Sequence, residues 1–127
     1  MTSPTDTVTQ FCAAWPALDI DALVGFFADD AVYHNIPVDP VVGREAIELT
    51  IAGFTTGVQT VEFEIVHLVA DGPVVLTERI DRFTWPSGDV AELPVMGTFE
   101  VHDGKITQWR DYFDMQQFMS QLPASDG

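Results

Sequence analysis

One acidic residue, Asp111, is a candidate for chemistry because the aromatic residues around it would remove it from water. Asp111 lies in the aromatic segment 107–114, whose composition is typical of a β-strand. Alternate residues of a strand share a face, so Asp111 would stand between Trp109 and Phe113. A carboxylate in apolar surroundings loses hydration, and its charged form is disfavoured unless a partner compensates. Asp111 is therefore a candidate for proton transfer.

A second acidic residue, Asp81, has the same setting in segment 77–85. Its face of the expected strand also holds Arg79 and Phe83. A guanidinium can donate to two carboxylates at once through its fork of N–H groups. We predict that the two strand faces look into one pocket, where Arg79 bridges Asp81 and Asp111. The pattern alone leaves two simpler readings open, an outward-facing Asp and an ordinary structural ion pair.

Other polar residues give weaker signals. Tyr33 and Asn35 share a face of an earlier strand, where core packing of the tyrosine and a turn role of the asparagine at the strand end are the preferred explanations from the residues alone. The three histidines match no ligand spacing, and the single cysteine, Cys12, excludes an internal disulfide and a cysteine-based zinc cluster. We therefore predict no metal site, and we place Cys12 in the core.

Length and charge limit the kinds of partner. The chain has 127 residues, of which 46% are apolar, with 20 acidic and 5 basic side chains and a formal charge of −15. That length predicts one domain over residues 1–127, with a core at 5–118 and a tail at 119–127. The acidic surface argues against nucleic acid and anionic membranes as partners. Neither a signal peptide nor a membrane-spanning segment is visible, which indicates the cytoplasm.

Hydrophobic spacing predicts helices first and long strands afterwards. The expected helices cover residues 3–15, 19–27, 43–57 and 115–122, and the expected strands cover 31–36, 58–69, 73–85, 90–102 and 105–113. Strict alternation in 58–69 would put His67 and Val69 on the same face as Val61. The Asp-Gly pairs at 71–72 and 103–104 predict hairpin turns. This order predicts an α+β fold, in which about three N-terminal helices cover one face of a curved, mostly antiparallel but mixed sheet.

Three segments taken together are more specific than any one of them. Residues 33–35 (YHN), 77–81 (TERID) and 109–114 (WRDYFD) resemble the limonene-1,2-epoxide hydrolase family. Segments 43–46 (GREA) and 103–107 (DGKIT) are similar too, and the resemblance extends from Val8 to Phe118. It implies the cone-shaped nuclear transport factor 2-like fold and a cofactor-free homodimer.

The resemblance also implies a role for each matched residue. Asp111 matches the base that deprotonates a water, Tyr33 and Asn35 match the residues that hold this water, and Asp81 matches the acid that protonates the epoxide oxygen. Arg79 matches the bridge between the two carboxylates. The expected pocket wall consists of Trp109, Phe83, Phe113, Leu93 and Val95. The implied reaction hydrates a hydrophobic epoxide, such as a terpene or cyclic epoxide, to a vicinal diol in one step without a covalent intermediate.

Two other functions remain open at this level. An isomerase or polyketide cyclase on the same fold would also use an Asp base and aromatic walls, although it gains nothing obvious from an arginine between two carboxylates. A non-catalytic binding or dimerisation module would keep Arg79 and Asp81 only as an ion pair. An open pocket with both carboxylates within reach of one guanidinium favours the hydrolase.

Overall fold

The computed structural model describes residues 2–123, and within them it has the predicted α+β architecture with a single curved sheet. The helical elements are α1 (Pro4–Ala14), the 3-10 turn η1 (Trp15–Ala17), α2 (Ile20–Val24), α3 (Arg44–Thr55) and α4 (Met115–Met119). The strands are β1 (Phe27–Asn35), β2 (Val41–Val42), β3 (Thr60–Asp71), β4 (Val74–Thr84), β5 (Val90–His102) and β6 (Lys105–Tyr112). The sheet order is β2-β1-β6-β5-β4-β3, and β1 and β6 run parallel while the other neighbours run antiparallel.

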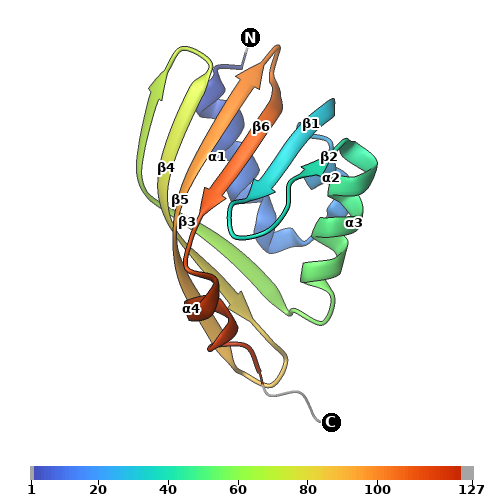
Figure 1. Cartoon of the computed structure of the whole chain (residues 1–127), viewed down its shortest axis with the longest axis vertical. Coiled ribbons are helices and arrows are strands. Elements are labelled where there is room, and N and C mark those ends of the chain that lie inside the picture. The colour runs from blue at the N-terminus through green and yellow to red at the C-terminus, as the bar shows by residue number, and fades with distance from the viewer. Residues whose placement is uncertain (1, 124–127) are drawn as a thin grey trace.

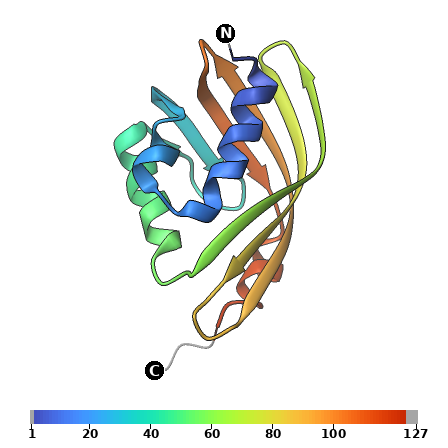
Figure 2. The same ribbon diagram turned by 180° about the vertical axis from the view of Figure 1, so that it is seen from behind.

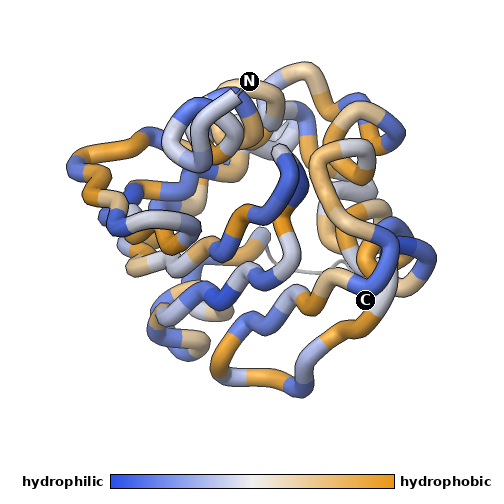
Figure 3. The backbone as a smooth tube through the Cα atoms, turned by 90° about the horizontal axis from the view of Figure 1, so that it is seen from above, coloured by the Kyte–Doolittle hydropathy of each residue, from blue (hydrophilic) through white to orange (hydrophobic). Residues whose placement is uncertain are grey.

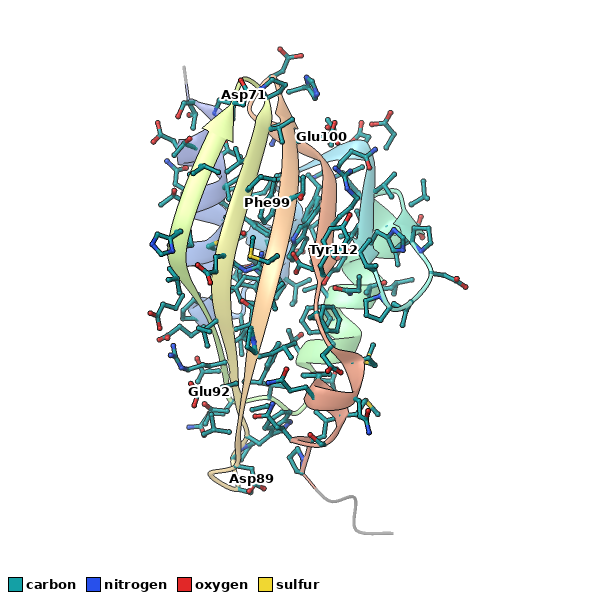
Figure 4. All side chains as sticks on the ribbon, turned by 60° about the vertical axis from the view of Figure 1, so that its left-hand side comes forward. Asp71, Asp89, Glu92, Phe99, Glu100 and Tyr112 are labelled. Atoms are coloured by element: carbon teal, nitrogen blue, oxygen red, sulfur yellow. The ribbon has the colours of Figure 1, made fainter. Side chains whose placement is uncertain are left out.

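The helices cover the inner face of this sheet (Figures 1 and 2). Helix α1 packs across the long strands, α3 lies beside β1 and β2, and α4 sits at the far end of β5. Strand β4 runs the length of the molecule between two turns, which Asp71 and Asp89 mark at opposite ends of the sheet (Figure 4). The curved sheet and the helices on its inner face therefore enclose the interior of the molecule.

Aromatic side chains fill the interior between α1 and the sheet. Phe11 of α1 meets Trp15, Phe27 and Trp109 edge to face, with ring centroids 5.7, 5.4 and 5.1 Å away. All four side chains are fully buried. Along the strands hydrophobic and hydrophilic stretches alternate (Figure 3), as expected of a sheet with one covered face. Cys12 is buried in this core, as the sequence predicts.

Local signals fix most of the element ends. The cap residue Ser3 accepts a hydrogen bond from the Asp6 amide, and the cap residue Asp19 accepts one from the Ala22 amide, so both satisfy a free N–H of a first helical turn. At the β5–β6 hairpin, Asp103 and Gly104 have φ of 53° and 75°, the left-handed pair that a two-residue turn needs. Both predicted Asp-Gly turns are present.

Three predicted boundaries are wrong by three residues or more. The second helix ends at Val24 instead of Phe27, and the strand that follows begins at Phe27 instead of Ala31. Pairing between Phe27 and Ile106 and burial of the Phe27 ring against Phe11 override the helical spacing. The short strand β2 was not predicted. The C-terminal helix, expected over 115–122, ends at Met119 instead. Residues 124–127 of the predicted tail lie outside the described part of the chain.

A β-bulge between Ile65 and His67 overturns the predicted face of the end of β3. One extra residue inverts the alternation. His67 therefore points outward, with 79% of its side chain exposed and a 2.8 Å contact to Glu78, and Val69 is exposed as well. A second register shift, where Glu100 pairs with Gln108 and Val101 pairs with Ile106, interrupts the alternation in β6. It turns Ile106 inward, whereas strict alternation from Asp111 would place Thr107 there.

Within residues 2–123 no helix is long and apolar enough to cross a membrane.

Candidate active site

The structure brings Arg79, Asp81 and Asp111 together around one guanidinium. Arg79 donates to both oxygens of Asp81, from Nε at 3.0 Å and from Nη2 at 2.9 Å. It also donates to both oxygens of Asp111, from Nη1 at 3.1 Å and from Nη2 at 2.8 Å. Arg79 is 0% exposed and each Asp is 4% exposed. Strand parity therefore located all three side chains correctly on the inner face.

The two carboxylates come from β4 and β6, which are separated by β5, so the cluster must cross β5. It does so over Gly97, which pairs with Thr77 on one side and Asp111 on the other. A Cβ at position 97 would lie 2.6 Å from Asp111 Oδ1 and 3.1 Å from Thr77 Oγ1, and it would overlap Arg79 Nη1. The bridge therefore requires glycine at this position.

Sequence reasoning missed the role of Gly97. The signal was present, since glycine inside a strand often marks a close approach of another group. It became specific only once the register placed Gly97 between Thr77 and Asp111. Thr77 was also missed, and its Oγ1 accepts from Arg79 Nη1 at 3.2 Å and donates to the Gly97 carbonyl at 3.3 Å.

Trp109 occupies a different place from the predicted one. It is fully buried, and it is absent from the described residues that line the cavity. Its ring is stacked against Tyr33 at 4.1 Å and against Phe99 at 5.5 Å, and Nε1 donates to Asp111 Oδ1 at 2.7 Å. Aromatic neighbours on both faces thus hold Trp109 behind Asp111 instead of in the pocket wall. From there it supplies Asp111 with a third hydrogen bond.

Burial changes the proton affinity of the cluster. Loss of hydration raises the pKa of the Asp81 carboxyl to about 6, against the opposing charge of Arg79 and with help from the charge of Asp111. Burial alone would lower the pKa of Arg79, but the charges of Asp111 and Asp81 raise it well above its usual range. The guanidinium is therefore permanently charged, and Asp81 keeps its proton to a higher pH than an ordinary aspartate does.

Both carboxylates face one apolar cavity of about 140 Å³. Four predicted wall residues line it, namely Phe83, Leu93, Val95 and Phe113. Tyr33 and Asn35 line it with Asp81 and Asp111. Sequence reasoning missed the remaining lining residues, which are Val38, Phe54, Phe63, Met115 and Phe118. Phe54 and Phe63 have the inward-facing spacing of ordinary core residues. Only the three-dimensional structure shows that they line the cavity.

Strand β1 supplies the two neutral polar groups of the cavity. It runs parallel to β6, with Tyr33 beside Trp109 and Asn35 beside Asp111. Burial, with the charge of Asp111 next, raises the pKa of the Tyr33 hydroxyl far above its usual range, so this group stays a hydrogen-bond donor. His34 points away, and its Nε2 lies 2.9 Å from the Val38 carbonyl. In residues 2–123 no three His, Cys, Asp or Glu side chains gather as a metal ion would require.

A model of the limonene-1,2-epoxide hydrolase catalytic domain matches residues 2–124. The chain belongs to the limonene-1,2-epoxide hydrolase family. A curated relative is the epoxide hydrolase EphG of Mycobacterium tuberculosis strain H37Rv, which is 36% identical over 115 residues, covering 91% of this chain and 76% of EphG. Membership in this family agrees with the resemblance of the three sequence segments.

Solved structures agree with this family and its fold. An epoxide hydrolase of M. tuberculosis that resembles limonene-1,2-epoxide hydrolase superposes with a TM-score of 0.79 at 34% identity, covering 91% of this chain and 86% of the other. A nuclear transport factor 2-like protein of unknown function from Burkholderia pseudomallei superposes with a TM-score of 0.84 at 17% identity, covering 98% and 100%. The second likeness concerns the fold alone, and it confirms the predicted nuclear transport factor 2-like architecture.

Proposed function

We propose that this family member is an epoxide hydrolase that acts as one domain and adds water to a hydrophobic epoxide, giving a vicinal diol in one step. The observation that carries this proposal is the buried guanidinium of Arg79, which holds two carboxylates that both face the same apolar cavity. Family membership supports epoxide hydrolysis in general. The cluster supplies a base and an acid in one place, which is what opening an epoxide with water requires.

The proton acceptor in this mechanism is Asp111. A water held by Tyr33, Asn35 and Asp111 loses a proton to the Asp111 carboxylate while its oxygen bonds to an epoxide carbon. The carbon–oxygen bond of the ring breaks at the same time, and the leaving oxygen takes the proton of Asp81. One proton must then pass from Asp111 to Asp81, through water, before the next turnover. No ester to the protein forms.

The contacts support this division of roles. Asp111 accepts hydrogen bonds from two nitrogens of Arg79 and from Trp109, whereas Asp81 accepts only those of Arg79 among the hydrogen bonds of residues 2–123. Donors stabilise an ionised carboxylate, so the negative charge is better placed on Asp111. The raised pKa of Asp81, about 6, supports Asp81 as the protonated partner. The apolar walls favour a terpene or cyclic epoxide over a polar one.

Labelled water tests the chemistry directly. In a single turnover of cyclohexene oxide or limonene oxide in H₂¹⁸O, the diol should carry the label at once and the protein should carry none. Label that first enters the protein would rule out direct attack by water. Asp111→Asn should fold normally and lose turnover by about 10⁴-fold, because the base is gone. Normal hydrolysis by this variant would show that Asp111 is not the base.

We further propose that the protein works as a cytoplasmic homodimer, with no nucleic acid or membrane as partner. Support comes from the outer sheet face, where Val69, Leu76, Met96 and Tyr112 are 62, 40, 52 and 48% exposed. Cross-strand pairing of Val69 with Leu76 and of Met96 with Tyr112 puts these side chains on one face. Analytical ultracentrifugation should give a dimer mass, and Met96→Glu should shift it to a monomer.

A further inference from the structure

The first half of β5, which carries the cavity residues Leu93 and Val95, has an open edge that the main sheet leaves unpaired. In the described part of the chain, β6 follows β5 only as far as the pair Met96–Tyr112. Beyond that point Val90–Val95 pairs with β4 alone. An open edge presents free N–H and C=O groups, and proteins usually cover them. The segment after β6 crosses this edge as helix α4 (Figure 1).

One side chain closes that edge as a neighbouring strand would. The amide oxygen of Gln121 accepts from the Glu92 backbone N–H at 2.9 Å, and its amide nitrogen donates to the Glu92 carbonyl at 2.9 Å. The same nitrogen lies 3.1 Å from the Gln117 carbonyl of α4, which ties the helix to this contact. Gln121 therefore joins α4 to the free edge of β5.

The joined helix is a wall of the cavity. Met115 and Phe118 line the pocket, and the Phe118 ring meets Phe83 with centroids 5.5 Å apart. Helix α4 is otherwise lightly held, since none of its five residues is buried. Its first turn is capped by Asp114, which accepts from the Gln117 amide. A short helix with so little burial depends strongly on each remaining contact.

We propose that Gln121 is a positioning residue that sets substrate size, because its two hydrogen bonds to Glu92 hold Phe118 against the pocket. This inference rests on the proposed function for the identity of the substrate. When the contact is broken, α4 moves away from β5 and the wall formed by Met115 and Phe118 retreats. The larger cavity then binds bulky epoxides more tightly and small epoxides more weakly.

The test replaces Gln121 by Met, which keeps the length of the side chain and removes both hydrogen bonds. Gln116→Met is the matched control, because Gln116 is an exposed residue of α4, the helix that Gln121 joins to β5. Hydrogen exchange of the Glu92 amide should become about tenfold faster in Gln121→Met, the factor expected for one lost hydrogen bond, and should not change in Gln116→Met.

The functional readout is the ratio of kcat/KM for limonene oxide to that for cyclohexene oxide. We expect Gln121→Met to raise this ratio at least about threefold while Gln116→Met leaves it unchanged, since small apolar differences in a pocket carry effects of this size or more. General destabilisation would lower both rates alike and would not move the ratio. Affinities for the two epoxides, measured calorimetrically in the Asp111→Asn background, report pocket size whether or not the protein hydrolyses them.

Two results would overturn the proposal. Unchanged exchange of the Glu92 amide would show that Gln121 does not hold the edge. Faster exchange with an unchanged ratio of rates and of affinities would show that the contact does not set substrate size. An inactive wild-type protein would refute the proposed function, and the exchange and affinity measurements would still decide on Gln121.

Discussion

Strand β4 carries two arginines three positions apart, and each is the centre of a cluster of carboxylates. Arg79 points inward, is 0% exposed, and holds Asp81 and Asp111. Arg82 points outward, and its side chain is 31% exposed. Its partners are Glu62 at 2.6 Å, Glu64 at 2.7 Å and Glu92 at 2.8 Å. Residue types and distances are nearly the same in both clusters, so the surroundings make the difference.

The comparison shows that burial is what turns an arginine–carboxylate cluster into a candidate for catalysis. Around Arg82 water and salt screen the charges, so the cluster is an ordinary surface ion-pair network. Around Arg79 the loss of hydration raises the pKa of Asp81 to about 6. Positions 79 and 82 are an odd number of residues apart, so strand alternation alone places Arg79 on the buried face of β4 and Arg82 on the exposed face.

The sharpest way to separate the clusters is to remove each guanidinium and keep its volume. Arg79→Met should cost about 3–5 kcal/mol of unfolding free energy at pH 8, because two buried carboxylates lose their shared partner. The loss should shrink at pH 4, where the carboxylates take up protons. Denaturant unfolding at both pH values measures this. A loss at pH 8 no larger than that of Arg82→Met would show that the two clusters are equivalent.

The pH dependence of stability isolates Asp81. Its folded-state pKa of about 6 is above the ordinary value, so the folded protein binds this proton more tightly than the unfolded chain does. The stabilisation is therefore complete below about pH 4 and is lost as pH rises through about 6. Relative to Asp81→Asn, which cannot ionise, the wild type should lose about 3 kcal/mol of unfolding free energy between pH 4 and pH 8. A difference that stays constant with pH would contradict the raised pKa.

Only the buried cluster demands a glycine beneath it. Gly97→Ala should lower kcat/KM for an epoxide by about a hundredfold, because the added methyl group displaces Arg79 and Asp111 from each other. Gly53→Ala in α3 is the control, since a Cβ there meets nothing within 4 Å. The control should keep full activity and gain a little stability as a helical alanine. Equal activity of the two variants would mean that the bridge tolerates a shift.

Much of this site followed from the sequence because it rests on local alternation. The inward faces of 77–85 and 107–114 placed Arg79, Asp81 and Asp111 correctly, and the Asp-Gly turns fixed the strand ends. The features that were missed depend on register between distant strands. Gly97 acquires its role only from lying opposite Thr77 and Asp111, and Trp109 lies behind Asp111 because Tyr33 and Phe99 enclose it.

Errors arose where tertiary contacts override a local period. Phe27 fits a helical face, yet pairing with Ile106 draws it into β1. The bulge after Ile65 adds one residue that no composition signal announces, and it reverses the face of His67. A bulge of this kind in β4 would have exchanged the positions of the two arginine clusters. The site prediction therefore depended on the regular pairing of β4 with β5.

The smallest effect is expected at Arg82, and it has its own signature. Arg82→Met should shift the thermal midpoint by no more than a few degrees and leave kcat/KM for an epoxide unchanged, because a surface cluster contributes little. The shift should fade in 0.5 M NaCl, since salt screens exposed charges. Arg79→Met should retain most of its loss of stability in the same salt, because dissolved ions do not reach the buried cluster of Arg79 and its two carboxylates. Equal salt sensitivity of the two variants would mean that water enters the inner cluster, and a cluster open to water would not raise the pKa of Asp81 to about 6.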